Sequence, residues 1–86
     1  MYRLFYNRKS VGDVLIISFF DELIPDRIVK NDNVVGLYLN NTLVGVNIFD
    51  FSKIVKIFYE GEIIDPNEEF IKLINHMLIN AGLSSL

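Results

Sequence analysis

The side chains best suited to chemistry in this chain of 86 residues are one histidine and a set of carboxylates. His76 is the only histidine, and the chain has no cysteine. A zinc site would therefore need three carboxylates around a single imidazole, which is a poor match to the ligands that zinc prefers. We expect His76 to be a solvated residue on a helix, and we expect the chain to use no metal and no cofactor.

The carboxylates and serines do not stand in patterns typical of catalysis. A general acid and base need a cleft that separates their pKa values, whereas these carboxylates gather in predicted turns and at a predicted helix start. The serines lack the Gly-x-Ser-x-Gly context that activates a nucleophile, and no glycine-rich phosphate loop is present. The sequence therefore predicts a protein that is not an enzyme and has no small-molecule substrate. The two carboxylate groups are Asp21, Glu22 and Asp26, and Asp65, Glu68 and Glu69.

One group of basic residues adjoins aromatic residues. Lys53 and Lys56 stand close to Phe58 and Tyr59. Basic residues interleaved with aromatic ones bind single-stranded RNA by phosphate contact and base stacking. Two cations contribute little affinity at physiological salt, and the chain carries a net charge of −3. These four residues are the candidate contact with RNA or a partner, and solvated surface charges are the alternative interpretation.

The elements that must position these residues are short strands followed by one helix. Val11–Phe20 is apolar along most of its length, which predicts a central strand buried on both faces. Phe51–Phe58 fits either a helical turn or a strand. The sequence thus predicts an α+β fold, with a mostly antiparallel sheet of about five short strands and a C-terminal helix packed on one face. The other predicted extended segments are Tyr2–Tyr6, Arg27–Lys30 at an edge, Val34–Leu39, Thr42–Phe49 and Glu62–Ile64.

A hairpin is predicted around Asn40 and Asn41, because asparagine tolerates the positive φ of a two-residue type I′ turn. In the simplest register Gly36 faces Gly45. Two glycines opposite each other leave a bare notch on one face of the sheet. A helix or an aromatic ring fills this notch, or a ligand or partner backbone enters it. Gly36 and Gly45 are therefore candidate interface positions.

The helix has clear end signals. Asp65 suits the N-cap, Pro66 the first helical position and Glu68 the third. Gly82 suits the left-handed residue that ends a helix. Ile79 is the apolar exception on the polar side, which makes it a candidate contact with a second domain or subunit. The predicted core face holds Phe70, Leu73, Ile74, Met77, Leu78 and Ala81, with Ile71 at its margin.

The composition is that of one globular domain spanning residues 1–86. Hydrophobic residues make up 51% of the chain and charged residues 22%, which is close to the globular average. No apolar run approaches the 20 or so residues that a membrane helix needs, and no signal-peptide pattern is visible. We therefore expect a cytoplasmic protein that does not bind membranes.

Several short segments together resemble one family. These are Phe5–Asn7, Val11–Leu15, Gly45–Phe49 and the helix end Asn80–Gly82. They are similar to segments in the N-terminal domain of bacterial YtpR-type tRNA-binding proteins. The resemblance implies a tight turn at Gly12-Asp13 and a side chain at Asn47 that holds a backbone turn.

In that family this domain precedes an oligomer-binding-fold domain similar to the tRNA-binding module of phenylalanyl-tRNA synthetase β subunits. We expect that module to be absent from this chain, which ends at Leu86. The resemblance implies a non-catalytic accessory domain of a tRNA-binding protein, serving docking, dimerisation or orientation. The net charge of −3 predicts weak affinity for tRNA on its own. The alternative is a stand-alone protein–protein interaction module with no role in RNA binding. A protein partner or a second copy of the chain fits either interpretation.

Overall fold

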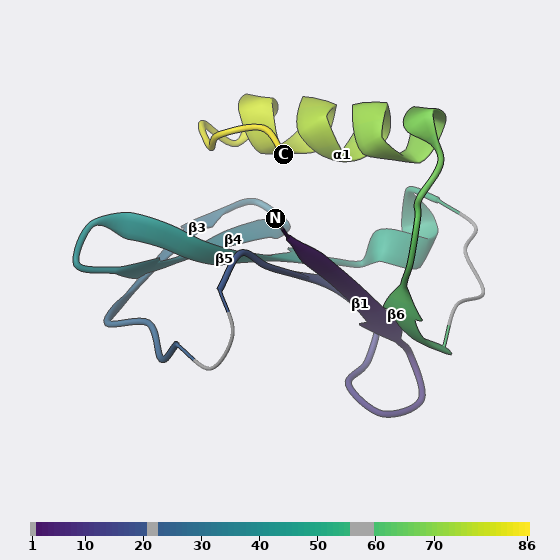
Figure 1. Ribbon diagram of the computed structural model, residues 1–86, viewed down its shortest axis with the longest axis horizontal. Helices are drawn as coiled ribbons and strands as arrows, with labels where there is room; N and C mark the ends of the chain where they lie inside the picture. Colours follow the sequence, from purple (N-terminus) through teal and green to yellow (C-terminus); the bar gives the residue numbers. More distant parts are fainter. Residues whose placement is uncertain (1, 21–22, 56–59) are drawn as a thin grey trace.

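The computed structural model, which describes residues 2–20, 23–55 and 60–86, has an antiparallel sheet with one helix on one of its faces (Figure 1). The α+β prediction is therefore confirmed. The sheet has six strands in the order β3-β4-β5-β2-β1-β6, and not about five, because the short segment around Gly61 pairs with the N-terminal strand. The elements are β1 (Arg3–Asn7), β2 (Val14–Ser18), β3 (Arg27–Asn31), β4 (Val34–Leu39), β5 (Thr42–Phe49), the 3₁₀ turn η1 (Phe51–Lys53), β6 (Glu60–Ile63) and α1 (Glu68–Asn80).

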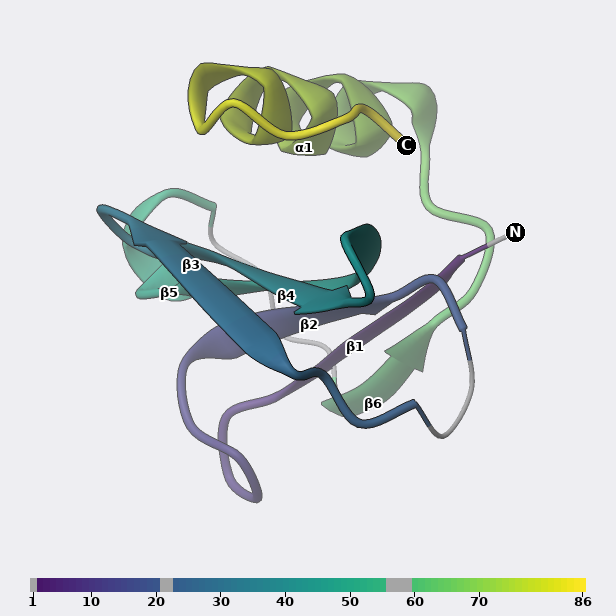
Figure 2. The ribbon, with the colours of Figure 1, turned by 90° about the vertical axis from the view of Figure 1, so that its left-hand side faces the viewer.

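The hydrophobic core lies between the sheet and α1. Alternate residues of a strand point to opposite faces, and one set packs against the helix, which crosses the strands on that side only (Figure 2). Ile74 and Leu78 of α1 are fully buried against the sheet. The strand residues of this core are Leu4, Tyr6, Leu15, Ile17, Val34, Val46, Ile48 and Ile63.

The predicted central strand is interior but shorter than expected, and α1 covers only one of its faces. β2 lies between β5 and β1 and runs from Val14 to Ser18. It cannot begin earlier, because Gly12 has a φ of 90° and its carbonyl accepts a hydrogen bond from the Val14 amide at 2.9 Å. Leu15 and Ile17 are buried under α1, whereas Ile16 on the opposite face is only half-buried. The expectation of burial on both faces holds only in part, because Val14 on the face opposite α1 is buried whereas Ile16 beside it is half-buried.

The β4–β5 hairpin has the predicted turn, but its register changes after two pairs. Asn40 and Asn41 both have positive φ, 50° and 66°, as a type I′ turn requires. A β-bulge then shifts the pairing, so that Gly36 lies opposite Val46 and Gly45 opposite Leu37. The predicted pairing of the two glycines was therefore wrong. A hairpin turn fixes which residues lie opposite each other only as far as the first β-bulge, where an extra residue in one strand shifts the register.

The helix ends as predicted but begins later. Gly82 has a φ of 80°, and its amide donates to the Ile79 carbonyl while the Leu83 amide donates to the Leu78 carbonyl, which is the Schellman pattern. At the other end the N-cap is Asn67, whose side chain accepts from the Phe70 amide at 2.8 Å. The predicted cap at Asp65 was wrong.

No helix in the described part of the chain has the length and apolar character needed to span a bilayer.

Candidate functional site

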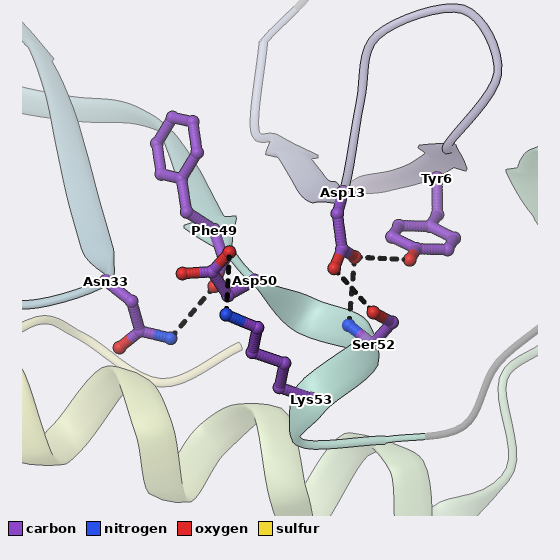
Figure 3. A network of polar contacts seen from close by, with 7 residues as sticks. All are labelled: Tyr6, Asp13, Asn33, Phe49, Asp50, Ser52 and Lys53. Atoms are coloured by element: carbon purple, nitrogen blue, oxygen red, sulfur yellow. Dashed lines mark hydrogen bonds and ion pairs between the residues drawn. The ribbon is translucent and has the colours of Figure 1, made fainter.

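The most elaborate polar cluster is built around the Asp13 carboxylate (Figure 3). The Tyr6 hydroxyl donates to it at 2.5 Å, and Ser52 donates twice, from its amide at 2.9 Å and from its hydroxyl at 2.5 Å. The Asp50 amide donates to the Asp13 backbone carbonyl at 2.9 Å. These bonds tie the start of β2 to the turn η1, and they also satisfy the hydroxyl of the fully buried Tyr6.

The cluster shifts two pKa values in opposite directions. Burial by itself raises the pKa of the Asp13 carboxyl, but the hydrogen bonds from Ser52 and Tyr6 outweigh it and hold this pKa below its usual value. Burial and the hydrogen bond to Asp13 raise the pKa of the Tyr6 phenol. At neutral pH the cluster therefore consists of an ionised carboxylate and neutral donors, which is the arrangement of a structural anchor.

The tight turn implied at Gly12-Asp13 is confirmed, but the role of the Asp13 side chain was missed. Ser52 is separated from Asp13 by 39 positions, and no short motif connects them. The only available signal was a carboxylate placed immediately before an apolar strand. Asn47 does not hold a turn. It lies within β5, and the backbone turn beside it is held by Asn33, whose amide nitrogen donates to the Phe49 carbonyl at 3.0 Å (Figure 3).

Only one of the four residues predicted to contact RNA or a partner lies within the described part of the chain. Lys53 is exposed at the end of η1, and its ammonium lies 3.9 Å from the Asp50 carboxylate (Figure 3). An exposed pair of this kind contributes little to stability, yet it reduces the positive potential that a phosphate would meet. Lys56, Phe58 and Tyr59 lie outside the described residues.

The two candidate glycines are buried in different surroundings. A Cβ atom at Gly36 would lie 3.2 Å from the Tyr38 ring and 3.4 Å from the Leu83 side chain. A Cβ atom at Gly45 would lie 3.1 Å from the Ile17 carbonyl oxygen, which is part of the neighbouring backbone. An aromatic ring and the segment after α1 thus fill the space above Gly36, and neither glycine lines an open notch.

Gly36→Val is expected to lower the free energy of unfolding by about 1–2 kcal/mol, although valine is the better strand former. The added methyl groups must displace Tyr38, Leu83 or Leu43. Gly36→Ala is the control, because it adds only the Cβ and should cost less. Urea denaturation of both variants measures the difference. A valine variant as stable as the wild type would mean that the space above Gly36 is free.

The outer side of α1 carries the two candidate residues His76 and Ile79. His76 is exposed, as predicted, and its Nε2 lies 3.1 Å from the Asn80 amide nitrogen. Ile79 is 61% exposed on the same side of the helix. Within the described ranges no three His, Cys, Asp or Glu side chains are grouped closely enough to hold a metal ion.

The face of the sheet opposite α1, here called the open face, carries a continuous row of side chains across all six strands. The pairs of adjacent strands place these residues directly beside one another, with a cation at one end, a carboxylate at the other and mainly apolar side chains between them. Near the middle, the Asn47 Oδ1 atom is buried and has no hydrogen-bond partner among the described residues. The row, here called the cross-strand row, is Lys30, Val35, Asn47, Ile16, Phe5 and Glu62.

Two hollows flank the cross-strand row. The first, of about 370 Å³, lies at the β3–β5 side, between Lys30, Val35 and Phe49. The ring of Phe49 points away from α1 in Figure 3. The second, of about 250 Å³, is lined mainly by side chains of β1 and β2, and Arg3 and Glu62, which form an ion pair at 2.9 Å, stand at its rim. This surface is not evident from the sequence, because the strand order brings its residues together from separate segments.

The fold and these surfaces define a small α+β domain whose single sheet is covered by a helix on one side. A family described as "Domain of unknown function (DUF4479)" matches residues 24–86. The chain therefore belongs to the DUF4479 family. No curated protein and no solved structure gives a significant match to this sequence.

Proposed function

We propose that this domain is a non-catalytic accessory domain of a tRNA-binding protein, in which it serves docking, dimerisation or orientation. The observation that carries the docking role is the open face, where apolar side chains and two hollows have no covering element in the described structure. An uncovered apolar sheet face favours contact with another protein surface. The engagement of Asp13 by three donors supports the non-catalytic part, since this carboxylate is occupied in holding the fold together.

The tRNA context rests on the resemblance to YtpR-type proteins. The segments that carry this resemblance include strand residues of the three adjacent strands β1, β2 and β5, where Tyr6 pairs with Leu15 and Leu15 pairs with Ile48. They support a shared fold, and the RNA role is inferred from the family alone.

A titration of tRNA with this chain at 150 mM salt tests the accessory role. We expect a Kd no tighter than about 10⁻⁴ M, because the net charge is −3 and the described cation of the predicted contact, Lys53, is paired with Asp50. Any binding at low salt should weaken with a slope of about two in log–log form. Lys53→Ala should reduce this slope by about one, and Lys72→Ala on the outer side of α1 should leave it unchanged. Saturable binding in the micromolar range would make this domain a primary RNA-binding element and would contradict the proposal.

The second candidate is a stand-alone protein–protein interaction module without an RNA role. The pairing of Lys53 with Asp50 favours it, since the predicted RNA contact is partly neutralised. The same titration separates the two candidates. Complete absence of salt-dependent tRNA binding, even at low ionic strength, is the result expected for this second function.

A further inference from the structure

We propose that the open face is the interface of a symmetric homodimer, in which two copies of the chain pack face to face about a two-fold axis parallel to the strands. This inference rests on the docking role proposed above and names its partner as a second copy of the chain. A two-fold interface uses the same patch on both copies, so the patch must be complementary to itself. The cross-strand row and the loops beside it meet this condition.

The charges of the cross-strand row match under this symmetry. The axis passes between β5 and β2, the middle pair of the six strands, and it turns the row end for end. Lys30 of each copy then lies over Glu62 of the other. Glu62 is already paired with Arg3, but a carboxylate has enough lone pairs to accept a second cation. A two-fold axis running across the strands would instead place Lys30 over Lys30, which is repulsive.

The interior of the row is suited to burial. The same symmetry places Val35 of one copy over Phe5 of the other, and Asn47 beside Ile16 close to the axis.

Two loops project from the sheet on the side away from α1, and both carry exposed apolar side chains (Figures 1 and 2). Val11 lies in the β1–β2 loop, and Ile24, which is 84% exposed, lies in the β2–β3 connection. The β1–β2 loop is at the end of the sheet where Val14 pairs with Phe49, and the β2–β3 connection is at the opposite end.

The two-fold axis brings each loop over a hollow of the second copy. Val11 approaches the hollow beside Phe49, and Ile24 approaches the hollow beside Arg3 and Ser18. The surface thus offers both the protrusions and the depressions of a self-complementary interface.

The area of the open face is small for a stable interface, which favours a reversible dimer. Six strands about 4.8 Å apart and about five residues long cover about 400 Å², which is about half of the 800 Å² that each partner commonly buries in a stable complex. The loops must supply the remainder. Substitutions at the loop tips should therefore weaken the dimer strongly.

Sedimentation velocity of the chain from about 5 to about 500 µM tests the proposal, since a reversible dimer grows with concentration by mass action. We expect the wild type to shift from monomer to dimer across this range. Ile24→Asp should weaken dimerisation at least tenfold, and the matched control Ile79→Asp, at an exposed isoleucine on the outer side of α1, should leave it unchanged. Circular dichroism checks that both variants fold. A monomeric wild type, or a dimer that Ile79→Asp disrupts or that Ile24→Asp leaves intact, overturns the proposal.

A charge exchange tests the symmetry itself. Lys30→Glu should weaken the dimer at low salt, and combining it with Glu62→Lys should restore the dimer, because opposite charges then face each other again across the interface. Lys72→Glu is the control with the same change in net charge. Failure of the double variant to regain the dimer excludes this arrangement. A monomeric chain that still behaves as expected in the tRNA titration would overturn the dimer while leaving the proposed accessory function in place.

Discussion

Replacing Ile74 with alanine is expected to lower the free energy of unfolding by about 2–5 kcal/mol. Ile74 is fully buried at the centre of the contact between α1 and the sheet. Alanine would leave a cavity there, because a packed core relaxes only partly after a large side chain is replaced by a small one. Small domains have about 5–15 kcal/mol of total stability, so the variant should unfold at a much lower urea concentration, and the midpoint of a denaturation curve measures this.

The control is Ile79→Ala on the same helix. Ile79 is 61% exposed, and a substitution at such a position should change stability by no more than about 0.5 kcal/mol. The two variants, Ile74→Ala and Ile79→Ala, make the same substitution on the same helix. The difference in their stabilities therefore measures the effect of burial alone. Equal effects of the two substitutions would show that the core face of α1 has been assigned to the wrong side.

Asp13→Asn is expected to have the second largest effect, a loss of on the order of 3 kcal/mol at pH 7. The substitution preserves the shape of the side chain but removes the charge that Ser52 and Tyr6 stabilise by hydrogen bonding. Hydrogen bonds to charged groups contribute about 1.5–3 kcal/mol, and a buried donor left without an acceptor adds a further penalty. Asparagine keeps only one acceptor oxygen, so either the Ser52 hydroxyl, or the Tyr6 hydroxyl together with the Ser52 amide, then faces an NH2 group instead of an oxygen. Urea denaturation at pH 7 measures the loss.

The pH dependence of stability provides a separate check. The pKa of Asp13 is lowered in the folded state, so its contribution is complete above the unfolded value of about 3.9 and is lost as the pH falls through the folded value. The pKa of Tyr6 is raised, so its contribution is complete below the unfolded value of about 10 and is lost as the pH rises through the folded value. Both contributions are therefore present between about pH 4 and pH 10.

In Asp13→Asn the loss of stability that sets in as the pH falls below about 4 should become less steep. The control is Asp32→Asn, because Asp32 is an exposed turn residue with a φ of 56° that asparagine tolerates equally well. It should retain the wild-type stability at pH 7. An Asp13→Asn protein whose stability falls with acid as steeply as that of the wild type would show that the carboxylate does not act as the anchor described above.

Local features of this fold could be predicted from the sequence because their interactions join residues only a few positions apart. The positive φ angles of Asn40 and Asn41 and the left-handed Gly82 follow from what these residues tolerate. The core face of α1 follows from the helical period, and Ile74 and Leu78 are buried as that period requires.

Other features depended on atoms that only the folded chain brings together. The helix start moved from Asp65 to Asn67, since both residues can cap and the path of the chain from β6 decides which one does. The register of Gly36 depended on a bulge, and the position of a bulge is set by side-chain packing against the neighbouring strands.

The same distinction between local features and long-range contacts applies to the candidate sites. The sequence alone determined the α+β class, one central strand, the hairpin turn and the buried side of the helix, because hydrophobic period and backbone preference are properties of short segments. The tertiary structure decided which residues share a site. It joined Asp13 to Ser52 and ordered the strands so that Lys30, Asn47 and Glu62 stand in one row. Contacts between distant residues depend on strand order and register, and many sequences with the same local pattern are compatible with several orders.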